Sequence, residues 1–337
     1  SASTPSTVAD PESACGDRKL SDRAQDLTIP IAVGVLCNDR DEVLIAKRPK
    51  GRYQAGLWEF PGGKIEPGED GRAGLRRELR EELGIEITIA RPLIQVRYRY
   101  ADRAVLLDCW RVSRWEGEVH GREGQRIAWA RPEALDERRF LPADKAILTA
   151  ARLPALYLIS PDPGPDLDAF LATLDARLGA GLRLFQLRCR EIPLPRYRVL
   201  VREARALCER YGARLLLNSA LGQALAPLAH GLHLTSTDLR ALKRRPLGRD
   251  WLIAASCHDA REIEQASRLA LDFIVLGPVL PTPAHPDTST LGWTGFTDLV
   301  RRVPLPAYAL GGLGPAHLPR AWRSGAQGIA AIRGLWG

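Results

Sequence analysis

The sequence predicts two α/β domains. Residues 28–152 are expected to form a sandwich of helices around a mixed sheet, and residues 153–337 a compact (β/α)8 barrel that lacks a full final helix. Three observations lead to this prediction. The chain has 337 residues, 45% of them hydrophobic, which suits two cores better than one. Pro154 marks a change of texture. After it, eight short apolar runs alternate with helical stretches, as in a closed parallel barrel.

Composition narrows the class of protein. Residues 1–27 are rich in Ser, Thr, Asp and Ala and contain no apolar run, so a disordered tail is expected there. No stretch approaches the roughly 18 apolar residues of a membrane span. The 6 cysteines show no CxxC spacing, which indicates reduced thiols in a cytoplasmic protein. The net charge of +8 indicates an anionic small substrate, and direct nucleic-acid binding is not expected, because no Lys/Arg run exceeds three residues.

Strands of the first domain are predicted where apolar residues run together or alternate. Ile29–Leu36 is almost continuously apolar, and a turn over residues 38–41 joins it to Val43–Ala46. The remaining predicted elements are strands at Glu86–Val96, Tyr98–Tyr100, Val105–Val112 and Ile127–Trp129, and helices at Pro132–Leu135 and Asp144–Ala151.

The segment from Gly63 to Ile85 contains the highest concentration of candidate functional side chains. It opens as a Gly/Pro turn and continues as a helix that ends at Gly84. At about 100° per residue, Glu78, Glu81 and Glu82 share roughly a third of the helix circumference, beside an apolar stripe of leucines. Crowded carboxylates attract cations, and Mg²⁺ takes few carboxylates and bridges phosphate oxygens. A polyphosphate substrate is therefore indicated. The alternative is an ordinary amphipathic surface helix with i,i+4 ion pairs.

The full pattern is Gly, five residues, Glu, seven residues, then Arg-Glu-apolar-x-Glu-Glu-x-Gly-apolar, and residues 63–85 meet it at every position. This resembles the Nudix box. Further stretches resemble the MutT type of Nudix hydrolase: Ile31–Val35, Trp58–Glu66, Ser113–Glu118, Gly121–Gln125 and Leu141–Asp144. The resemblance implies a Nudix sandwich and an 8-oxo-dGTP diphosphatase that releases the monophosphate and pyrophosphate and so sanitises the nucleotide pool.

The same resemblance implies roles for single residues. Two or more Mg²⁺ ions, for which Mn²⁺ can substitute, would be held by the catalytic and metal-site residues Gly63, Glu78, Glu81, Glu82 and Glu123. Glu123 would be a further ligand or the general base. Glu69 and Arg77 would pair to hold the turn against the helix. Arg48 would contact phosphate, and Arg103 and Asp144 would contact the purine. Glu59 and Phe60 complete the set of substrate-binding residues.

One of these positions departs from the family pattern. The best-known members carry Asn where Asp144 stands, and Asn offers both a donor and an acceptor, whereas an ionised Asp only accepts. The sequence therefore specifies the hydrolysis reaction better than it specifies the base of the nucleotide substrate. Asp144 could instead be a helix N-cap, and Arg48 a solvated loop charge.

The second domain is predicted element by element from short apolar runs and the helical patterns between them. The strands are expected at Leu156–Ile159, Leu182–Leu187, Arg214–Leu217, Gly231–Leu234, Leu252–Ala255, Phe273–Leu276, Pro306–Leu310 and Gly328–Ile332. Helical patterns include Leu167–Leu178, Tyr197–Tyr211, Ala260–Leu271 and Pro315–Ser324. The closing helix is expected to be missing or vestigial.

Motifs at the ends of these strands resemble the thiamine phosphate synthase/TenI family, a TIM-barrel family. They include Tyr157–Ser160, Gln186–Arg188, Gly231–Leu234, Ala255–His258, Leu276–Val279, Pro281–Pro283 and Ala309–Leu313. The resemblance implies a phosphate-ligand site formed by Gln186, Arg188, Asn218, Asp238, Ser256, Thr282, Gly311 and Gly312. His233, His258 and His317 are expected to be hydrogen-bonded structural residues.

Departures in the barrel bear on its activity. The usual Lys after Gln-x-Arg is Arg190, the acidic partner of Asn218 is Ser219, and the pyrophosphate loop ends in His285 instead of a permanent cation. Losing a metal ligand and a phosphate clamp would remove electrostatic stabilisation from pyrophosphate displacement. Three interpretations stay open: thiamine phosphate synthesis in a bifunctional enzyme, a phosphate-ligand module that regulates the hydrolase, and a purely structural barrel.

The arrangement of the two domains can also be predicted. The join between Arg152 and Leu156 is too short for a flexible tether, so the domains are expected to pack together, in a monomer or a homodimer. Without a closing helix, the groove beside strands eight and one needs a cover. The candidates are the helix around Ile147–Arg152, a second subunit, or a tail at Leu335–Trp336.

Overall fold

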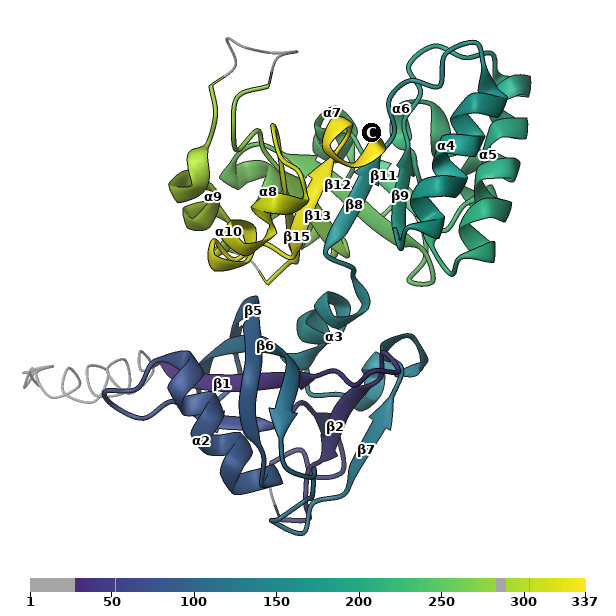
Figure 1. The fold of residues 1–337 in the computed structure, drawn as a ribbon. Helices are drawn as coiled ribbons and strands as arrows, with labels where there is room; N and C mark the ends of the chain where they lie inside the picture. Colours follow the sequence, from purple (N-terminus) through teal and green to yellow (C-terminus); the bar gives the residue numbers. More distant parts are fainter. Residues whose placement is uncertain (1–27, 52, 283–288, 303) are drawn as a thin grey trace, which may run out of the picture.

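The computed structural model describes residues 28–337 except 52, 283–288 and 303, and the predicted tail at residues 1–27 lies outside that part. Both predicted domains are present, one above the other with helix α3 (Asp144–Arg152) at their junction (Figure 1). The predicted fold class is confirmed: a mixed α/β domain is followed by a closed parallel barrel.

The strands described in the first domain form two sheets. The larger has the order β4-β1-β6-β5, with β1 (Thr28–Leu36) parallel to β6 (Ala104–Glu116) and the other pairs antiparallel. Its edges are β4 (Gly62–Lys64) and β5 (Glu86–Arg99). The sequence suggested a break between Val96 and Tyr98, which is wrong, because pairing with β6 continues through both residues. The second sheet, β3-β2-β7, is antiparallel and was not foreseen as a separate unit: β3 (Trp58–Glu59), β2 (Val43–Lys47), β7 (Ile127–Ala130).

Helix α2 (Gly71–Leu83) covers one side of the larger sheet. Asp70 caps its N-terminus by accepting from the Ala73 N–H at 2.8 Å, and Gly84 ends it with φ 75°. Its predicted leucine stripe is fully buried against Ala32, Leu36 and Leu44. Helix α3 belongs to the cluster on the other side, together with Leu135 and Phe140, which follow two short 3-10 helices, Pro132–Ala134 and Glu137–Arg139. The sandwich is therefore built from two separate apolar clusters.

The barrel closes through eight described strands in the order β10-β11-β12-β13-β14-β15-β8-β9, all parallel. The strands are β8 (Leu156–Ile159), β9 (Leu184–Leu187), β10 (Arg214–Asn218), β11 (Gly231–Leu234), β12 (Leu252–Cys257), β13 (Phe273–Leu276), β14 (Ala307–Leu310) and β15 (Gly328–Ala331). The α-helices between them are α4 (Leu167–Gly179), α5 (Leu194–Arg210), α6 (Ser219–Gly222), α7 (Ser236–Ala241), α8 (Ala260–Arg268), α9 (Gly292–Val300) and α10 (Leu318–Arg323).

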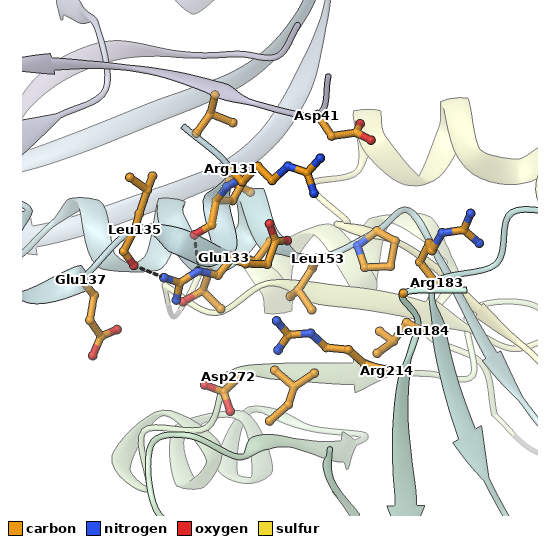
Figure 2. Close-up of a pocket in the computed structure, with 18 of the residues that line it drawn as sticks. Asp41, Arg131, Glu133, Leu135, Glu137, Leu153, Arg183, Leu184, Arg214 and Asp272 are labelled. Atoms are coloured by element: carbon orange, nitrogen blue, oxygen red, sulfur yellow. Dashed lines mark hydrogen bonds between the residues drawn. The ribbon is translucent and has the colours of Figure 1, made fainter. Parts of the chain in front are cut away.

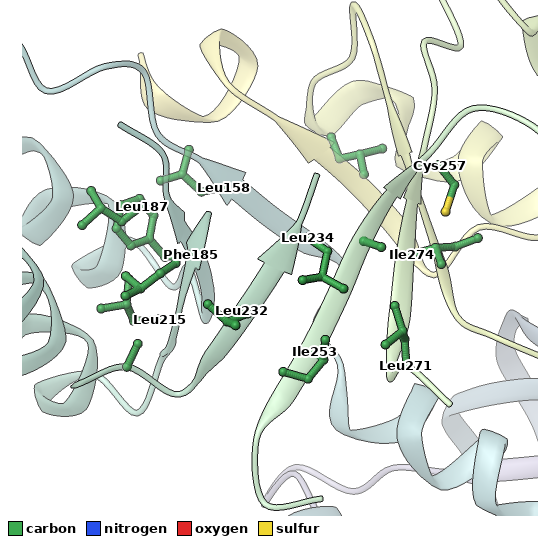
Figure 3. Close-up of a cluster of buried hydrophobic side chains, with 14 of the residues drawn as sticks. Leu158, Phe185, Leu187, Leu215, Leu232, Leu234, Ile253, Cys257, Leu271 and Ile274 are labelled. Atoms are coloured by element: carbon green, nitrogen blue, oxygen red, sulfur yellow. The ribbon is translucent and has the colours of Figure 1, made fainter. Parts of the chain in front are cut away.

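Side chains of the barrel strands alternate between two clusters, as the period-two geometry of a strand requires. Leu158, Phe185 and Ile253 face outward against the helices, in the cluster shown in Figure 3. Their immediate neighbours in the chain, Tyr157, Leu184 and Ala254, belong to the cluster that fills the barrel interior. Alternation therefore separates a helix-facing core from an interior core.

The groove beside β8 and β15 is covered by the short helix α11 (Arg333–Trp336). The Trp336 ring lies 4.7 Å from the Phe170 ring and 6.4 Å from the Phe185 ring, between centroids. Arg177 Nε donates to the Trp336 carbonyl at 2.7 Å. Of the three covers predicted from the sequence, the tail at Leu335–Trp336 is the one in place.

The two domains pack together, as predicted. Buried Gln327 donates from Nε2 to the carbonyls of Ala150 and Leu153, at 3.0 and 2.8 Å. Tyr308 Oη donates to the Pro154 carbonyl at 2.6 Å. Arg91 of β5 lies over the Trp322 ring of α10, 4.3 Å from its centroid. Leu153 itself belongs to the barrel's interior cluster.

Among the described residues, no helix has both the length and the apolar character needed to cross a bilayer. The described cysteines, Cys37, Cys109, Cys189, Cys208 and Cys257, are all buried and free.

Candidate active site

Two adjacent glycines bring the backbone of β4 against the carboxylates of α2. Gly62 has φ 148°, and a Cβ there would collide with the Ala32 carbonyl of β1. A Cβ on Gly63 would collide with the Glu78 carboxylate. This close approach lets the Gly62 N–H donate to Glu82 Oε2 at 3.2 Å. The Gly-Gly pair is thus a packing requirement of the site.

Glu82 is the centre of the acidic group. Burial is the main cause of a pKa raised to about 8; the negative charges of Glu123, Glu78 and Glu59 also raise it, and the hydrogen bond from Gly62 opposes the shift. Each of those carboxylates is therefore close enough to Glu82 to affect its pKa. The structure brings together the predicted metal-site residues Gly63, Glu78, Glu82 and Glu123.

Arg77 connects the turn before helix α2 to the carboxylates on the helix. It donates from Nε and Nη2 to the two oxygens of Glu69, both at 3.0 Å, and from Nη2 to the Lys64 carbonyl at 2.8 Å. Its Nη1 donates to Glu78 at 2.7 Å. These bonds raise the pKa of Arg77 and lower that of Glu69. The predicted pairing of Glu69 with Arg77 is present in the structure.

Glu81 is the most exposed carboxylate of the predicted set. Its side chain is 59% exposed and lies 3.7 Å from Arg77 Nη1, the i,i+4 pair of an ordinary surface helix. Within the described ranges, no three carboxylate, histidine or cysteine side chains are arranged to hold a metal ion. Glu78 is instead bonded to Arg77, and Glu82 to the Gly62 N–H. The donors themselves, carboxylate oxygen atoms, suit a hard divalent cation.

A second corner of the site forms around Asp144, which is 4% exposed. Its Oδ2 accepts from the Phe60 N–H at 3.2 Å. The N-cap alternative is wrong, because Ala143 occupies the cap position of α3 and makes no side-chain cap bond. Burial, with a smaller contribution from the charge of Glu59, raises the pKa of Asp144 to about 8, while the Phe60 hydrogen bond and Arg48 oppose the shift.

Arg48 and Glu59 stand between the two corners. Arg48 pairs with Glu59 and donates from Nε to the Tyr53 carbonyl at 2.9 Å. Its side chain is only 18% exposed, so the alternative of a solvated loop charge is wrong. The negative charge of Glu59 raises the pKa of both Glu82 and Asp144. Glu59 thus links the acidic group to the Asp144 corner.

Arg103 lies beside two tyrosines that the sequence did not single out. Its guanidinium carbon is 5.3 Å from the Tyr53 ring centroid and 5.5 Å from that of Tyr100. Burial and Asp144 together raise the pKa of Tyr100 to about 12, which places Tyr100 next to Asp144. The sequence signal was the Tyr98-Arg99-Tyr100 run, interpreted only as a strand.

The barrel has its own cluster of buried polar side chains near the C-terminal strand ends, where barrel sites form. Gln186 Nε2 donates to Tyr157 Oη at 3.1 Å, and Asn218 Nδ2 donates to Gln186 Oε1 at 3.3 Å. Tyr157 Oη also bonds His233 Nδ1 at 3.0 Å, and His233 Nε2 bonds Ser256 Oγ at 2.8 Å. The predicted residues Gln186, Asn218 and Ser256 thus form one chain, and His233 is satisfied within it.

The other two histidines are also hydrogen-bonded, as predicted. His258 Nδ1 lies 2.9 Å from Glu262 Oε2. His317 Nδ1 accepts from the Gly314 N–H at 3.1 Å.

Asp238 is held by hydroxyls. Thr235 Oγ1 donates to Asp238 Oδ2 at 2.8 Å, and Ser219 Oγ donates to the same oxygen. Ser219 therefore satisfies the carboxylate where the family carries a second acid. Arg188 donates its backbone N–H to Ser160 Oγ at 2.9 Å, and burial lowers the pKa of its guanidinium.

The phosphate-cradle prediction rests on two glycines with positive φ. Gly311 and Gly312 have φ 108° and 64°, and a Cβ on either would press on residues 278–281. Thr282 is described and half-buried. The rest of the predicted pyrophosphate loop, including His285, lies outside the described residues.

Comparison with known proteins finds a family for each of the two domains. The family described as a NUDIX domain matches residues 32–150, and the family described as thiamine monophosphate synthase matches residues 156–335. The chain belongs to the Nudix family through its first domain and to the thiamine monophosphate synthase family through its second. It is therefore a Nudix hydrolase fused to a thiamine-phosphate-synthase-like barrel, and Nudix hydrolases are generally dependent on a divalent metal ion.

Three relatives show the relationship. The 8-oxo-dGTP diphosphatase of Escherichia coli is 38% identical over 120 residues, which are 36% of this chain and 93% of the relative. The CTP pyrophosphohydrolase of the same organism is 42% identical over 113 residues, 33% of this chain and 84% of the relative. The thiamine-phosphate synthase of Thioalkalivibrio sulfidiphilus is 32% identical over 190 residues, 56% of this chain and 90% of the relative.

Proposed function

We propose that the first domain hydrolyses oxidised purine nucleoside triphosphates, with 8-oxo-dGTP as the preferred substrate, to the monophosphate and pyrophosphate. The observation that carries this proposal is the adjacency of two corners with different chemistry. The acidic group around Glu82 suits a metal-bound triphosphate, and the Asp144 corner offers hydrogen-bonding groups and tyrosine rings to a base.

Mg²⁺ fits the acidic group, with Glu78, Glu81, Glu82 and Glu123 as the carboxylates that would hold it and Gly63 beside them. When bound, it would supply charge stabilisation to phosphate oxygens and a more acidic water. The protein's own residues do the positioning. The Gly62 N–H fixes the Glu82 carboxylate, Arg77 fixes the turn over Glu69, and Arg48 presents a cation at the edge of the site.

The Asp144 corner supports a purine. With a pKa of about 8, Asp144 is mainly protonated at neutral pH, and a protonated carboxyl has one donor and one acceptor. It can then offer the hydrogen-bonding pattern of the Asn found in the best-known members of the MutT type. The Phe60 N–H holds one oxygen in place, and Tyr100 with Arg103 borders the corner.

A second candidate substrate is CTP. The observation in its favour is the 42% identity with the CTP pyrophosphohydrolase, against 38% with the 8-oxo-dGTP diphosphatase. The experiment that decides is a comparison of kcat/KM for 8-oxo-dGTP, dGTP and CTP with Mg²⁺. A preference for 8-oxo-dGTP over dGTP and CTP supports the proposal, and equal or higher kcat/KM for CTP overturns it.

For the barrel we propose a retained phosphate-ligand site rather than an active synthase. Two observations support this: Asp238 is held by two hydroxyls, and no second acid stands at position 219. The test is thiamine phosphate formation by the full chain, measured beside binding of thiamine phosphate. Binding without turnover agrees with the proposal, whereas turnover would establish a bifunctional enzyme.

A further inference from the structure

A large cavity lies between the two domains, at the end of the barrel opposite its strand-end site. Its volume is about 1170 Å³. It is lined by residues at or just before the starts of barrel strands, such as Arg183, Arg214 and Leu252, and by the junction residues Leu153 and Pro154. In Figure 2, Arg131 and Glu133 lie on one side of the cavity and Arg214 and Asp272 on the other. Both domains therefore contribute walls.

Half-buried guanidinium groups gather in this cavity. Arg91 and Arg111 lie directly opposite each other on β5 and β6. Burial, and then the charge of Arg111, lower the pKa of Arg91 to about 10. Like charges directly opposite across two strands destabilise a sheet. Arg152 and Arg214 line the same cavity from the two sides of the domain boundary and form a second pair of like charges. Burial lowers the pKa of Arg152, and Arg214 lowers it further.

These arginines are only partly compensated. Arg111 and Arg214 have no ion pair and no side-chain hydrogen bond with any described residue. Arg91 and Arg152 donate to main-chain carbonyls: Arg91 to Pro92, and Arg152 to Pro132 and Leu135. Of the lining acids, Asp272 is paired with Arg245 and Asp136 with Arg138. Glu137, Glu133 and Asp272 partly offset the charge of Arg152. Asp41 and Asp250 also line the cavity, and Asp41 acts on Cys37 together with Arg91 and Arg111.

We propose that this cavity is a binding site for a phosphate-bearing small anion, held by guanidinium groups from both domains. Arginine presents forked donors that match phosphate oxygens. An anion there would relieve the repulsion within both pairs. Arg91 is already oriented by its stacking on Trp322, and Arg152 by its two carbonyl partners, so both pairs are partly organised before a ligand arrives.

The test uses the full chain in EDTA, with inorganic pyrophosphate and GMP as probes in isothermal titration calorimetry. Removing the metal weakens phosphate binding at the hydrolase site. We expect pyrophosphate binding that falls at least tenfold in Arg111→Ala and in Arg214→Ala, and further in the double variant. Pyrophosphate should also raise the Tm of the wild type but not of the double variant. The comparison of pyrophosphate with GMP tells whether the cavity takes the bare phosphate groups or a whole nucleotide.

Three control variants locate the binding. Arg198→Ala, on the exposed face of α5, should bind like the wild type. Arg48→Ala and Arg188→Ala test the hydrolase site and the barrel's strand-end site. If either of these abolishes binding while Arg111→Ala does not, the anion occupies a known site and the proposal is wrong. Absence of binding to the wild type at millimolar probe also overturns it.

Discussion

At the scale of single residues, the fold keeps the carboxylates of the candidate site in unequal surroundings. Glu81 is open to solvent, whereas Glu82 is enclosed by the Gly62 backbone and by other acids. The same contrast separates Asp144, which is buried, from Glu69, which is paired with Arg77. Identical side-chain chemistry therefore serves different purposes, set by burial and by partners.

Replacing Glu82 by Gln should lower kcat by about 10²-fold or more, because a carboxylate proposed to hold the metal ion is lost. The amide oxygen of Gln can still accept from the Gly62 N–H, so the fold should persist. Steady-state kinetics and circular dichroism measure both expectations. Glu81→Gln should also lower kcat, whereas the matched control Glu69→Gln should cost less. Near-normal turnover in both the Glu81 and Glu82 variants would contradict the metal assignment.

The raised pKa of Asp144 should make the free energy of unfolding depend on pH. Its pKa is about 8 when folded and about 4 in an unfolded chain. The folded state therefore binds the proton more tightly, so this contribution is complete below pH ~4 and is lost as pH rises to ~8, by up to about 1.4 kcal/mol per unit. Urea unfolding from pH 5 to 8 should show a slope in the wild type that is reduced in Asp144→Asn. Equal slopes in the two proteins would contradict this.

The same residue predicts base selectivity. Asp144→Asn should keep the preference for 8-oxo-dGTP over dGTP at all pH values, because Asn always carries a donor and an acceptor. The wild type should lose preference above pH ~8, where Asp144 ionises, and Asp144→Ala should lose it throughout yet still hydrolyse both nucleotides. Competition assays with both nucleotides measure this. Unchanged selectivity in Asp144→Ala would mean that the base is read elsewhere.

At the scale of elements, helix α2 positions the site because both of its ends are fixed. Asp70 caps the first turn and Gly84 ends the last, while Leu75, Leu79 and Leu83 are fully buried. The carboxylates Glu78 and Glu82 are thereby turned toward β4. A rotation of the helix would bury charge or expose leucine, so its orientation is strongly determined.

Asp70→Ala should destabilise the first domain by about 1 kcal/mol, the usual cost of losing an N-cap. The change leaves every proposed site residue in place, so kcat at low temperature should be nearly unchanged. Differential scanning calorimetry measures the loss of stability. Asp70→Asn, which keeps the capping oxygen, is the matched control and should recover most of the stability.

At the scale of the whole molecule, the barrel is completed at one point by a short helix and at another by its neighbour domain. Trp336 covers Phe170 and Phe185, and Leu153 enters the interior cluster from the junction. Gln327 secures that junction through the carbonyls of Ala150 and Leu153. The first domain is thus docked at the end of the barrel where the strands begin.

Trp336→Ala should destabilise the barrel by about 2 kcal/mol, because a half-buried aromatic side chain loses its packing. Exposed apolar surface should then increase binding of the dye ANS. Trp336→Phe, which keeps an aromatic ring against Phe170, should lose less. Hydrolysis of nucleotides by the first domain should persist in both variants. Wild-type stability in Trp336→Ala would show that α11 is not needed as a cover.

Much of this protein follows from the sequence, because its main signals are local. Strand alternation and helical periodicity predicted the eight barrel strands, and the spacing of residues 63–85 predicted the acidic helix. The Glu69–Arg77 pair was also foreseen, since eight residues joined by a turn and a helix leave the partners little freedom.

The tertiary structure alone decided matters that depend on residues far apart in the chain. Asp144 accepts from Phe60, 84 positions earlier, and that contact, not its place at a helix start, defines its environment. Tyr100 is a candidate site residue only because the fold brings it near Asp144. Of the three candidate covers for the barrel groove, the structure shows the tail that carries Trp336. The cavity between Arg111 and Arg214 exists only because the domains dock. Local patterns fix which elements form, whereas burial and long-range contacts fix what each charged side chain meets.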